Sequence, residues 1–306
     1  MKTVKVLASA TVANVVCGFD CLGFALEYPY DEITVSLLET PEVRIFHKDA
    51  FGLSTDAKKN VAGVALDAVI SAVQNECGFE IEIKKGILPG SGIGSSAASA
   101  VGAVVAANEL LDQRFSLLEQ TEFALAGEFI ASNSRHADNV APCLYGGFTL
   151  VRSVSPLDVV NVQHPNLFAT VIHPQIEIKT SEAREMLPNV IELNAAAKGW
   201  ANVGALVAGL NTGDYELIAR SLEDKIIEPV RSRLIPHFYE LKYAALEAGA
   251  LGGGISGSGP SVFMLSKNNE EAREVEAAMS AVFEPTGIEF NTYVSAIGQN
   301  GVKLAS

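Results

Sequence analysis

The chain of 306 residues contains 22 basic and 36 acidic side chains, which gives a formal net charge of −14, and 48% of its residues are hydrophobic. This composition is typical of a globular protein and excludes intrinsic disorder and collagen-like repeats, while the length suggests two domains or lobes of about 150 residues each. Both halves of the chain are acidic, so no basic lobe can follow a nucleic-acid backbone and we expect no nucleic-acid partner.

The N-terminus has two lysines before an apolar stretch, as a signal peptide does. Ser9, Thr11 and Asn14 interrupt that stretch, and residues 2–10 alternate in the manner of a β-strand. No uninterrupted apolar run reaches the roughly 18 residues of a membrane span. We therefore expect no membrane partner.

The first half of the chain mixes predicted strands and helices. Alternating or apolar runs predict strands at residues 4–10, 33–38, 43–46, 80–84 and 145–154. Longer apolar-periodic runs predict helices at 60–75, 96–111 and 117–131. Turn-rich residues at 153–156 and 164–166 then indicate a boundary between two lobes, which we place at residues 1–160 and 161–306.

The second half continues in the same alternating way. Predicted strands lie at 167–173, 261–265 and 287–296, with a Gly-rich turn before the second of them. Predicted helices lie at 181–186, 194–210, 214–222, 235–248 and 270–283. Because no repeat of 30 to 50 residues is present, the pattern favours an α+β fold with two lobes.

The four cysteines, Cys17, Cys21, Cys77 and Cys143, are too few and too scattered to form a disulfide framework. A reducing, cytoplasmic compartment is the simplest interpretation. Cys17 and Cys21 are four residues apart, yet no second Cys or His pair follows at metal-ligand spacing. Small buried hydrophobic side chains are therefore favoured over a zinc site.

The most informative segment is residues 85–100, Lys-Gly-Ile-Leu-Pro-Gly-Ser-Gly-Ile-Gly-Ser-Ser-Ala-Ala-Ser-Ala. Its three loop glycines allow the backbone to turn with N–H groups facing one point. Ser95 and Ser96 are then predicted to cap a long Ala/Val helix whose positive end faces the same point. Convergent amides and a helix dipole form an anion site that suits a triphosphate.

Two familiar nucleotide motifs do not fit. A P-loop requires a lysine directly before its closing Ser or Thr, and Gly94 precedes Ser95. Residues 252–257 have the glycine spacing of a dinucleotide fingerprint, but a predicted helix precedes them and a strand follows, the reverse of a Rossmann turn. A tight connection is the plainer interpretation, and an NAD-linked dehydrogenase is an alternative that NADH binding would support.

Three motifs make the chain similar to the GHMP kinases, a family named for galactose, homoserine, mevalonate and phosphomevalonate kinases. They are residues 10–20 (Ala-Thr-Val-Ala-Asn-Val-Val-Cys-Gly-Phe-Asp), 89–98 (Pro-Gly-Ser-Gly-Ile-Gly-Ser-Ser-Ala-Ala) and 254–261 (Gly-Ile-Ser-Gly-Ser-Gly-Pro-Ser). The resemblance implies a two-lobed α+β GHMP-kinase fold, with an N-terminal ATP-binding lobe over 1–160 and a C-terminal ferredoxin-like α/β lobe over 161–306. ATP and substrate would occupy the cleft between the lobes, often in a homodimer.

Residues 135–142, 180–184 and 228–236 resemble in particular the members that act on L-homoserine. The implied reaction is transfer of the ATP γ-phosphate to the L-homoserine hydroxyl, giving O-phospho-L-homoserine in threonine biosynthesis. ATP would be the co-substrate and Mg²⁺ the cofactor of a cytoplasmic phosphotransferase.

The resemblance also assigns residues to ATP and the metal. Ser96 and Glu128 match the hydroxyl and carboxylate that hold Mg²⁺, although Glu128 by itself would be interpreted as a solvated helix carboxylate. Lys85 can neutralise phosphate charge, but it or Lys84 could equally be a strand-end lysine, and Asn60 could instead cap a helix. The implied ATP-binding residues are Asn60, Lys85, Pro89, Gly90, Ser91, Gly92, Ile93, Gly94, Ser95, Ser96 and Ala97.

An amino-acid substrate needs partners for an ammonium group, a carboxylate and a hydroxyl. Asp20 suits the ammonium group, while Arg184 and Arg231 suit the carboxylate through bidentate pairing. Without the resemblance, His136 would be a loop histidine and the arginines surface ion pairs. The implied substrate-binding residues are Asn14, Asp20, His136, Asn139, Thr180, Arg184, Arg231 and Gly257.

The implied catalytic residues are Asn14, Asn139, Ser96 and Glu128. Mevalonate-type members have an aspartate where this chain has Asn139, and an amide cannot accept a proton as a carboxylate does. A loose phosphoryl-transfer transition state depends on positioning and charge neutralisation more than on early deprotonation. We therefore expect Asn14 and Asn139 to orient the hydroxyl while the proton leaves late to a phosphate oxygen, with Asp138 as the rival base.

Two other functions stay open at this point. The first is a kinase for another small alcohol, which Asp20 and the two arginines disfavour because mevalonate has no ammonium group. The second is a non-catalytic nucleotide-binding or regulatory protein. Such a protein would be expected to lose Ser96 or Glu128, and both are present.

Overall fold

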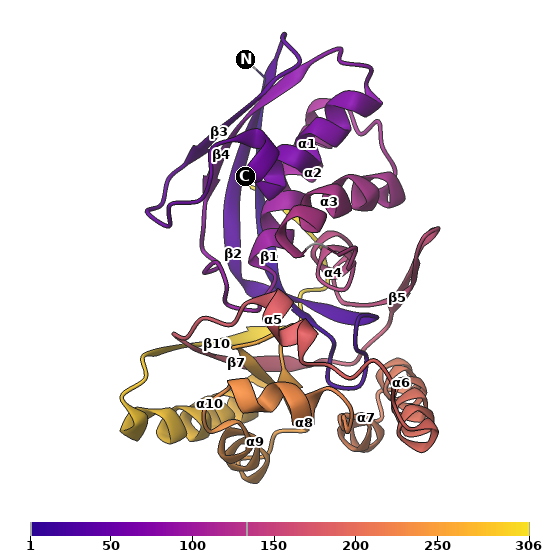
Figure 1. Cartoon of the computed structure of the whole chain (residues 1–306), viewed down its shortest axis with the longest axis vertical. Helices are drawn as coiled ribbons and strands as arrows, with labels where there is room; N and C mark the ends of the chain where they lie inside the picture. The colour runs from indigo at the N-terminus through magenta and orange to yellow at the C-terminus, as the bar shows by residue number, and fades with distance from the viewer. Residues whose placement is uncertain (1, 133, 306) are drawn as a thin grey trace.

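Two β-sheets, one in each lobe, organise the structure (Figure 1). The computed structural model describes residues 2–132 and 134–305, and the side chains of Ser132, Thr180 and Ser181 lie outside the described part. Within that part, the first sheet has seven strands in the order β11-β1-β2-β4-β3, with β5 and β6 added beside β2. These strands are β1 (Thr3–Ala13), β2 (Leu22–Leu38), β3 (Val43–His47), β4 (Gly78–Lys84), β5 (Phe148–Val154), β6 (Leu157–Val162) and β11 (Lys303–Leu304).

Helix α2 lies at the centre of the first lobe, between the sheet and two other helices (Figure 1). Its small side chains are buried on every face, as expected for a helix that is apolar all round. They also permit close packing, because a Cβ on Gly102 would lie 2.4 Å from Cδ1 of Ile33 on β2. The helices of this lobe are α1 (Val61–Ala72), α2 (Ser95–Leu110), α3 (Leu117–Ser132) and α4 (Val140–Tyr145).

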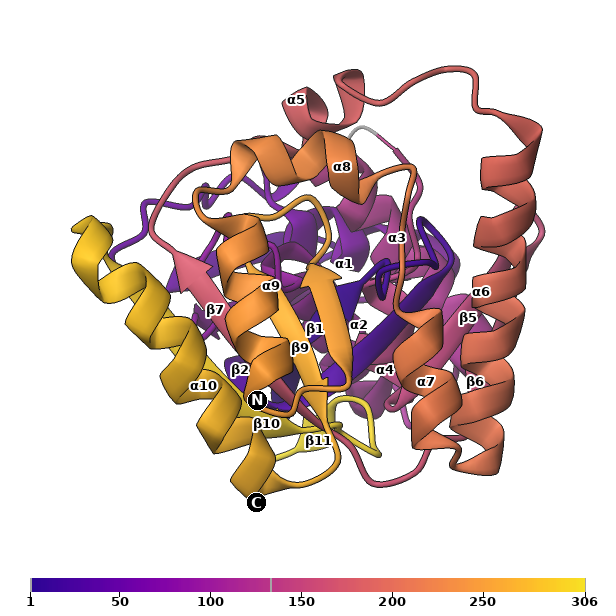
Figure 2. The same ribbon diagram turned by 90° about the horizontal axis from the view of Figure 1, so that it is seen from below.

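The second lobe has a four-stranded antiparallel sheet in the order β10-β7-β9-β8. Helices α9 and α10 cover one face (Figure 2), and the β-α-β-β-α-β order confirms the predicted ferredoxin-like lobe. On the other face, Phe263 contacts Phe24 of β2, with ring centroids 5.5 Å apart. The elements are β7 (Phe168–Pro174), α9 (Phe238–Glu247), β8 (Gly252–Ile255), β9 (Val262–Ser266), α10 (Asn269–Phe283) and β10 (Phe290–Ala296).

Further helices connect β7 to α9 and approach the boundary between the lobes (Figures 1 and 2). Two helices, α4 of the first lobe and α8 among the connecting helices, lie in motif segments where the sequence analysis predicted no helix. Among the described residues, no helix is long and apolar enough to cross a membrane. The connecting helices are α5 (Thr180–Glu185), α6 (Leu193–Thr212), α7 (Tyr215–Ser221) and α8 (Glu228–Arg231).

Three sequence predictions about strands and boundaries need correction. Residues 153–156 are not a lobe boundary but join β5 to β6, and the division at residue 160 falls inside β6. The chain also returns to the first sheet at its end, where β11 pairs with β1. The predicted Gly-rich turn is strand β8, where Gly253 allows a backbone approach so close that a Cβ would lie 2.0 Å from Phe263 O.

A buried ion pair fixes the end of β4 to the start of α2. Asp31 and Lys85 contact each other with side chains that are 0% and 1% exposed. The Lys85 ammonium also donates to Ser95 O at 2.8 Å and Ser99 Oγ at 2.9 Å. Asp31 Oδ1 accepts from the backbone N–H groups of Gly86 and Ile87, both at 3.0 Å. The side chains of the pair thus connect the start of the loop, at Gly86 and Ile87, to the first turns of α2.

We expect Lys85→Met to lower the free energy of unfolding by about 3–5 kcal/mol, because it leaves the buried Asp31 carboxylate without its counter-charge. The double variant Asp31→Asn/Lys85→Met should regain part of this loss, since the asparagine Oδ1 still accepts from the two backbone N–H groups. Urea unfolding without ligands measures both. The control Lys84→Met, whose side chain is 61% exposed, should leave the midpoint nearly unchanged. A double variant that is less stable than Lys85→Met would contradict the ion-pair explanation.

Candidate active site

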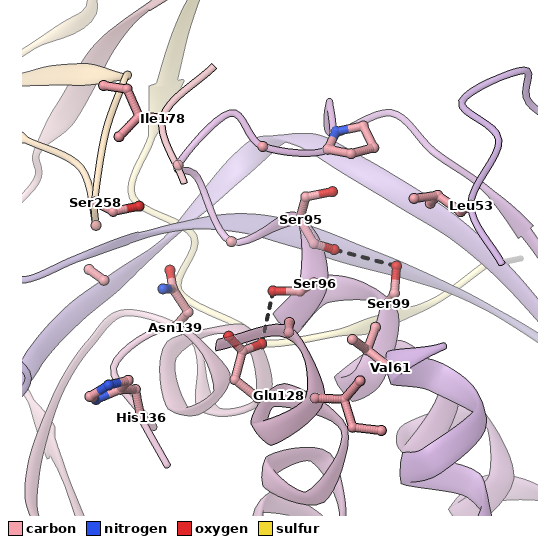
Figure 3. Close-up of a pocket in the computed structure, with 18 of the residues that line it drawn as sticks. Leu53, Val61, Ser95, Ser96, Ser99, Glu128, His136, Asn139, Ile178 and Ser258 are labelled. Atoms are coloured by element: carbon pink, nitrogen blue, oxygen red, sulfur yellow. Dashed lines mark hydrogen bonds between the residues drawn. The ribbon is translucent and has the colours of Figure 1, made fainter. Parts of the chain in front are cut away.

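A cavity of about 440 Å³ lies between the lobes and is lined by residues of both (Figure 3). In the close-up, Ser96 and Glu128 lie between His136 and Asn139 on one side and Val61 on the other. Of the predicted residues, the wall contains Asn14, Asp20, Asn60, Lys85, Pro89, Gly90, Gly92, Gly94, Ser95, Ser96, Glu128, His136, Asn139, Arg184, Arg231 and Gly257. Ser91, Ile93 and Ala97 are buried behind the wall, and the predicted contact of Thr180 falls on a side chain outside the described part.

The glycine-rich loop has the backbone conformation that its sequence predicts. Gly90, Gly92 and Gly94 have φ values of 76°, 80° and 72°, in the left-handed region that favours glycine. The prediction that serines cap the helix is wrong, because Gly94 is the N-cap and Ser95 and Ser96 lie in the first turn. Ser95 Oγ donates instead to Ile87 O at 3.0 Å. The first-turn N–H groups of α2 therefore have no side-chain cap, and Ser95 and Ser96 of this turn line the cavity, as the predicted anion site requires.

The third motif holds this loop from the second lobe. Ser256 Oγ donates to Gly92 O at 2.7 Å, and Ser261 Oγ donates to Ser91 O at 2.6 Å. The contact is close, since a Cβ on Gly92 would lie 2.5 Å from Gly259 O. The two motifs thus interlock, and the loop is positioned by both lobes.

Ser96 and Glu128 form the predicted hydroxyl–carboxylate pair, with Ser96 Oγ donating to Glu128 Oε2 at 2.8 Å (Figure 3). Burial raises the pKa of Glu128 to about 7, and the Ser96 hydrogen bond opposes this rise. Within the described ranges, no group of three or more His, Cys, Asp or Glu side chains could hold a metal ion by itself. A hydroxyl and one carboxylate fit Mg²⁺, which usually takes one or two carboxylates and completes its shell with water and phosphate oxygens.

A cluster of charged side chains forms the opposite end of the cavity. Arg184 donates to both carboxylate oxygens of Asp20, with Nη2···Oδ2 at 2.7 Å and Nη1···Oδ1 at 3.2 Å. Arg184 Nη1 also lies 3.0 Å from His136 Nε2. The guanidinium groups of Arg184 and Arg231 lie 5.5 and 5.1 Å from the centroid of the Phe19 ring. Burial lowers the pKa of His136 and so favours its neutral form, while the nearby Asp20 carboxylate opposes this shift.

Asn14 and Arg231 connect this cluster to the second lobe. Asn14 Nδ2 donates to Gly257 O at 2.8 Å, and Asn14 Oδ1 accepts from Asp20 N at 3.0 Å. Arg231 donates to Gly257 O at 3.1 Å and to Ala183 O at 3.2 Å. Both atoms of the Asn14 amide thus contact the protein backbone, which gives Asn14 a part in placing Asp20 and Gly257. Its predicted contact with the substrate hydroxyl stays a prediction.

Asp138 lies beside both ends of the cavity and is only 4% exposed. Burial raises the pKa of Asp138 to about 7, and the negative charges of Asp20 and Glu128 add to the rise. A carboxyl group with this pKa is partly protonated at neutral pH and can accept a proton. Its position is consistent with the rival-base hypothesis.

Another part of the wall combines the predicted Asn60 with two residues that the sequence analysis did not identify, His47 and Leu53. Asn60 is the N-cap of α1 and accepts from Ala62 N at 3.0 Å, which confirms the capping alternative, while it also lines the cavity. Asn60 Nδ2 lies 3.3 Å from His47 Nε2. His47 and Leu53 line the same region. A lone histidine and a loop leucine have no motif that could have revealed them.

Two models of the GHMP kinase family match the chain: the GHMP kinases N terminal domain at residues 60–147 and the GHMP kinases C terminal at 206–285. A homoserine kinase of Chlorobium phaeobacteroides (strain BS1) is 43% identical over 99% of this chain and 100% of that protein. The chain belongs to the GHMP kinases, in their homoserine kinase group. A homoserine kinase of Pyrococcus furiosus is 42% identical over 96% of this chain and 98% of its own length. The solved structure of a homoserine kinase from Cytophaga hutchinsonii has a TM-score of 0.95 at 49% identity, covering 100% of this chain and 98% of that one.

Two alternatives from the sequence concern a dinucleotide site and a zinc site, and the structure decides the first. The dinucleotide interpretation is wrong, because Gly252–Ile255 is a strand and not a turn from strand to helix. Cys17 and Cys21 are free thiols whose pKa values burial raises to about 12 and about 11. The structure places both side chains in half-buried positions, and the favoured interpretation as small hydrophobic side chains stays a prediction.

We expect Gly94→Ala to abolish most ATP-dependent turnover, because its Cβ would lie 2.0 Å from Thr11 Oγ1. Gly90→Ala is the matched control: Gly90 has a similar φ of 76°, but no atom lies within 4 Å of its Cβ position. The conformational cost of about 1–2 kcal/mol is common to both variants. Nucleotide affinity by calorimetry and kcat/KM for ATP measure the difference. Equal losses in both variants would show that packing against Thr11 is unimportant.

We expect Mg²⁺ affinity to fall about tenfold per pH unit below pH 7, because a proton on Glu128 competes with the cation. Raising the Mg²⁺ concentration should then move the acidic limb of the pH–rate profile to lower pH. Titration calorimetry with Mg²⁺ at pH 6, 7 and 8, in the presence of nucleotide, measures the affinity directly. If the acidic limb of the pH–rate profile stays at the same pH at all Mg²⁺ concentrations, the limb would instead be assigned to Asp138 acting as a base.

Proposed function

We propose that one end of the cavity binds the phosphates of Mg²⁺–ATP and the other end binds L-homoserine, whose hydroxyl receives the terminal phosphate. The observation that carries this proposal is the cluster of Asp20, Arg184 and Arg231, which shares one cavity with the glycine-rich loop of residues 89–94, called the phosphate loop from here on. Relatives named homoserine kinase, matched over nearly their whole length, support the same reaction.

The charged cluster suits a zwitterion because its own charges already form a complementary pair. An L-amino acid can replace the Asp20–Arg184 contact, with its ammonium group on Asp20 and its carboxylate on an arginine. Phe19 lies against both guanidinium groups and keeps their planes in place. A substrate without an ammonium group would leave the Asp20 carboxylate without a substrate partner, which favours an amino acid over mevalonate.

At the phosphate end, the N–H groups of the loop and of α2 bind the phosphate oxygens. Ser96 and Glu128 would hold Mg²⁺, which neutralises the charge of the β- and γ-phosphates. Lys85 stands behind the loop with its charge balanced by Asp31, and its predicted neutralisation of phosphate stays a prediction.

Asn139 faces the cavity between the two ends (Figure 3). Its amide orients the substrate hydroxyl toward the γ-phosphate, and the hydroxyl proton passes late to a phosphate oxygen. Positioning and charge neutralisation supply most of the catalysis in such a transfer. The homodimer implied by the family also stays a prediction.

We expect ADP release with L-homoserine and not with mevalonate, L-serine, L-threonine or shikimate, in an assay that couples ADP to NADH oxidation. Glu128→Gln should abolish the signal and serves as the blank, because it removes the carboxylate while keeping the side-chain shape. Asp20→Asn should raise KM for L-homoserine more than KM for ATP. Turnover with another alcohol alone would overturn the roles of Asp20, Arg184 and Arg231, and no ADP release from any of them would favour a non-catalytic protein.

A further inference from the structure

Thr11 on β1 contacts both halves of the site although it does not line the cavity. Its side chain is 0% exposed, and Oγ1 donates to Asn139 Oδ1 at 2.8 Å. Its backbone N–H donates to Ile93 O in the phosphate loop at 3.1 Å. Oγ1 also fills the space where a Cβ on Gly94 would lie, at 2.0 Å. One residue thus touches the loop that faces the phosphates and the amide that faces the hydroxyl.

Asn139 occupies the N-cap position of α4 but makes no capping hydrogen bond with its side chain. Asparagine at an N-cap usually accepts a backbone N–H of the first turn and stabilises the helix. Here Oδ1 accepts the Thr11 hydroxyl instead. The Asn139 side chain therefore does not cap the helix, and the bond to Thr11 holds it in one orientation.

The orientation matters because the two ends of an amide are chemically opposite. Nδ2 offers two N–H donors, while Oδ1 only accepts. With Oδ1 held by Thr11, Nδ2 is the end left to meet a substrate. A hydroxyl oxygen that accepts an N–H on one lone pair keeps the other for attack on phosphorus, and its own hydrogen is free to point at a phosphate oxygen. A reversed amide would accept that hydrogen and draw it away from the phosphate.

We propose that Thr11 is a positioning residue for phosphoryl transfer, whose hydroxyl sets the orientation of the Asn139 amide in register with the phosphate loop. This inference rests on the proposed function, in that Asn139 orients the acceptor hydroxyl. Because Thr11 also bonds to Ile93 and packs against Gly94, one residue positions both the Asn139 amide and the phosphate loop. Misplacement of a reacting group by about 1 Å costs up to about 100-fold in rate. Positioning the amide and the loop by the same residue limits such misplacement of the hydroxyl relative to the phosphates.

The test compares Thr11→Val, which keeps the shape and removes the hydroxyl, with Thr11→Ser, which keeps the hydroxyl. We expect kcat to fall about 10- to 100-fold in Thr11→Val, with KM for ATP unchanged, and Thr11→Ser to retain most activity. Thr11→Ala replaces the valine variant if that does not fold. The matched control is Thr149→Val, since Thr149 is 0% exposed on β5 and its hydroxyl has no hydrogen-bond partner among the described residues; its kcat should equal that of the wild type.

A double-mutant cycle separates positioning from a structural effect. If Thr11 acts through the amide, Thr11→Val should have no further effect on kcat in an Asn139→Ala background. The ratio of phosphorylated product to ADP should also fall in Thr11→Val, because a misoriented acceptor lets water compete. A wild-type kcat in Thr11→Val, or an equal fold-loss in both backgrounds, would overturn the inference.

Failure of the proposed function gives a different result. If the wild-type enzyme phosphorylates another alcohol and not L-homoserine, the substrate assignment falls, and the same cycle is run with that alcohol. Coupling between Thr11 and Asn139 would then still support the positioning role, and its absence would still overturn it.

Discussion

The position of the phosphate loop depends on two opposite charges that are almost completely buried. Asp31 and Lys85 lie beneath the loop, where either charge alone would be strongly destabilising. Because the ammonium group bonds to the carbonyl of Ser95, the pair also fixes the first turn of α2. The buried pair beneath the loop thus fixes the geometry of the N–H groups that face the cavity.

The proposed amino-acid end of the cavity contains an ion pair of the opposite kind. The side chains of Asp20 and Arg184 are 31% and 42% exposed, and a pair this exposed contributes little to stability. Exchanging its partners for those of a zwitterion therefore has a low cost. The same interaction, Asp with a basic side chain, is structural where it is buried and exchangeable where it faces the cavity.

Local signals explain what the sequence predicted correctly. The glycines at 90, 92 and 94 encode their own backbone conformation, which the structure confirms. Contacts between distant segments explain what was missed. Thr11 lies inside a recognised motif, but its role depends on Asn139, 128 positions away. Strand β8 contains three glycines and has no strand signal of its own, because pairing with β9 is what makes it a strand.

The interlock between the phosphate loop and the second lobe limits how the enzyme can open. A hinge that swung the lobes apart would break the hydrogen bonds from Ser256 and Ser261 to the loop. It would also separate Asn14 from Gly257. Movement of a peripheral segment such as α5, which carries Arg184, would leave these hydrogen bonds intact, whereas separation of the two sheets would break them.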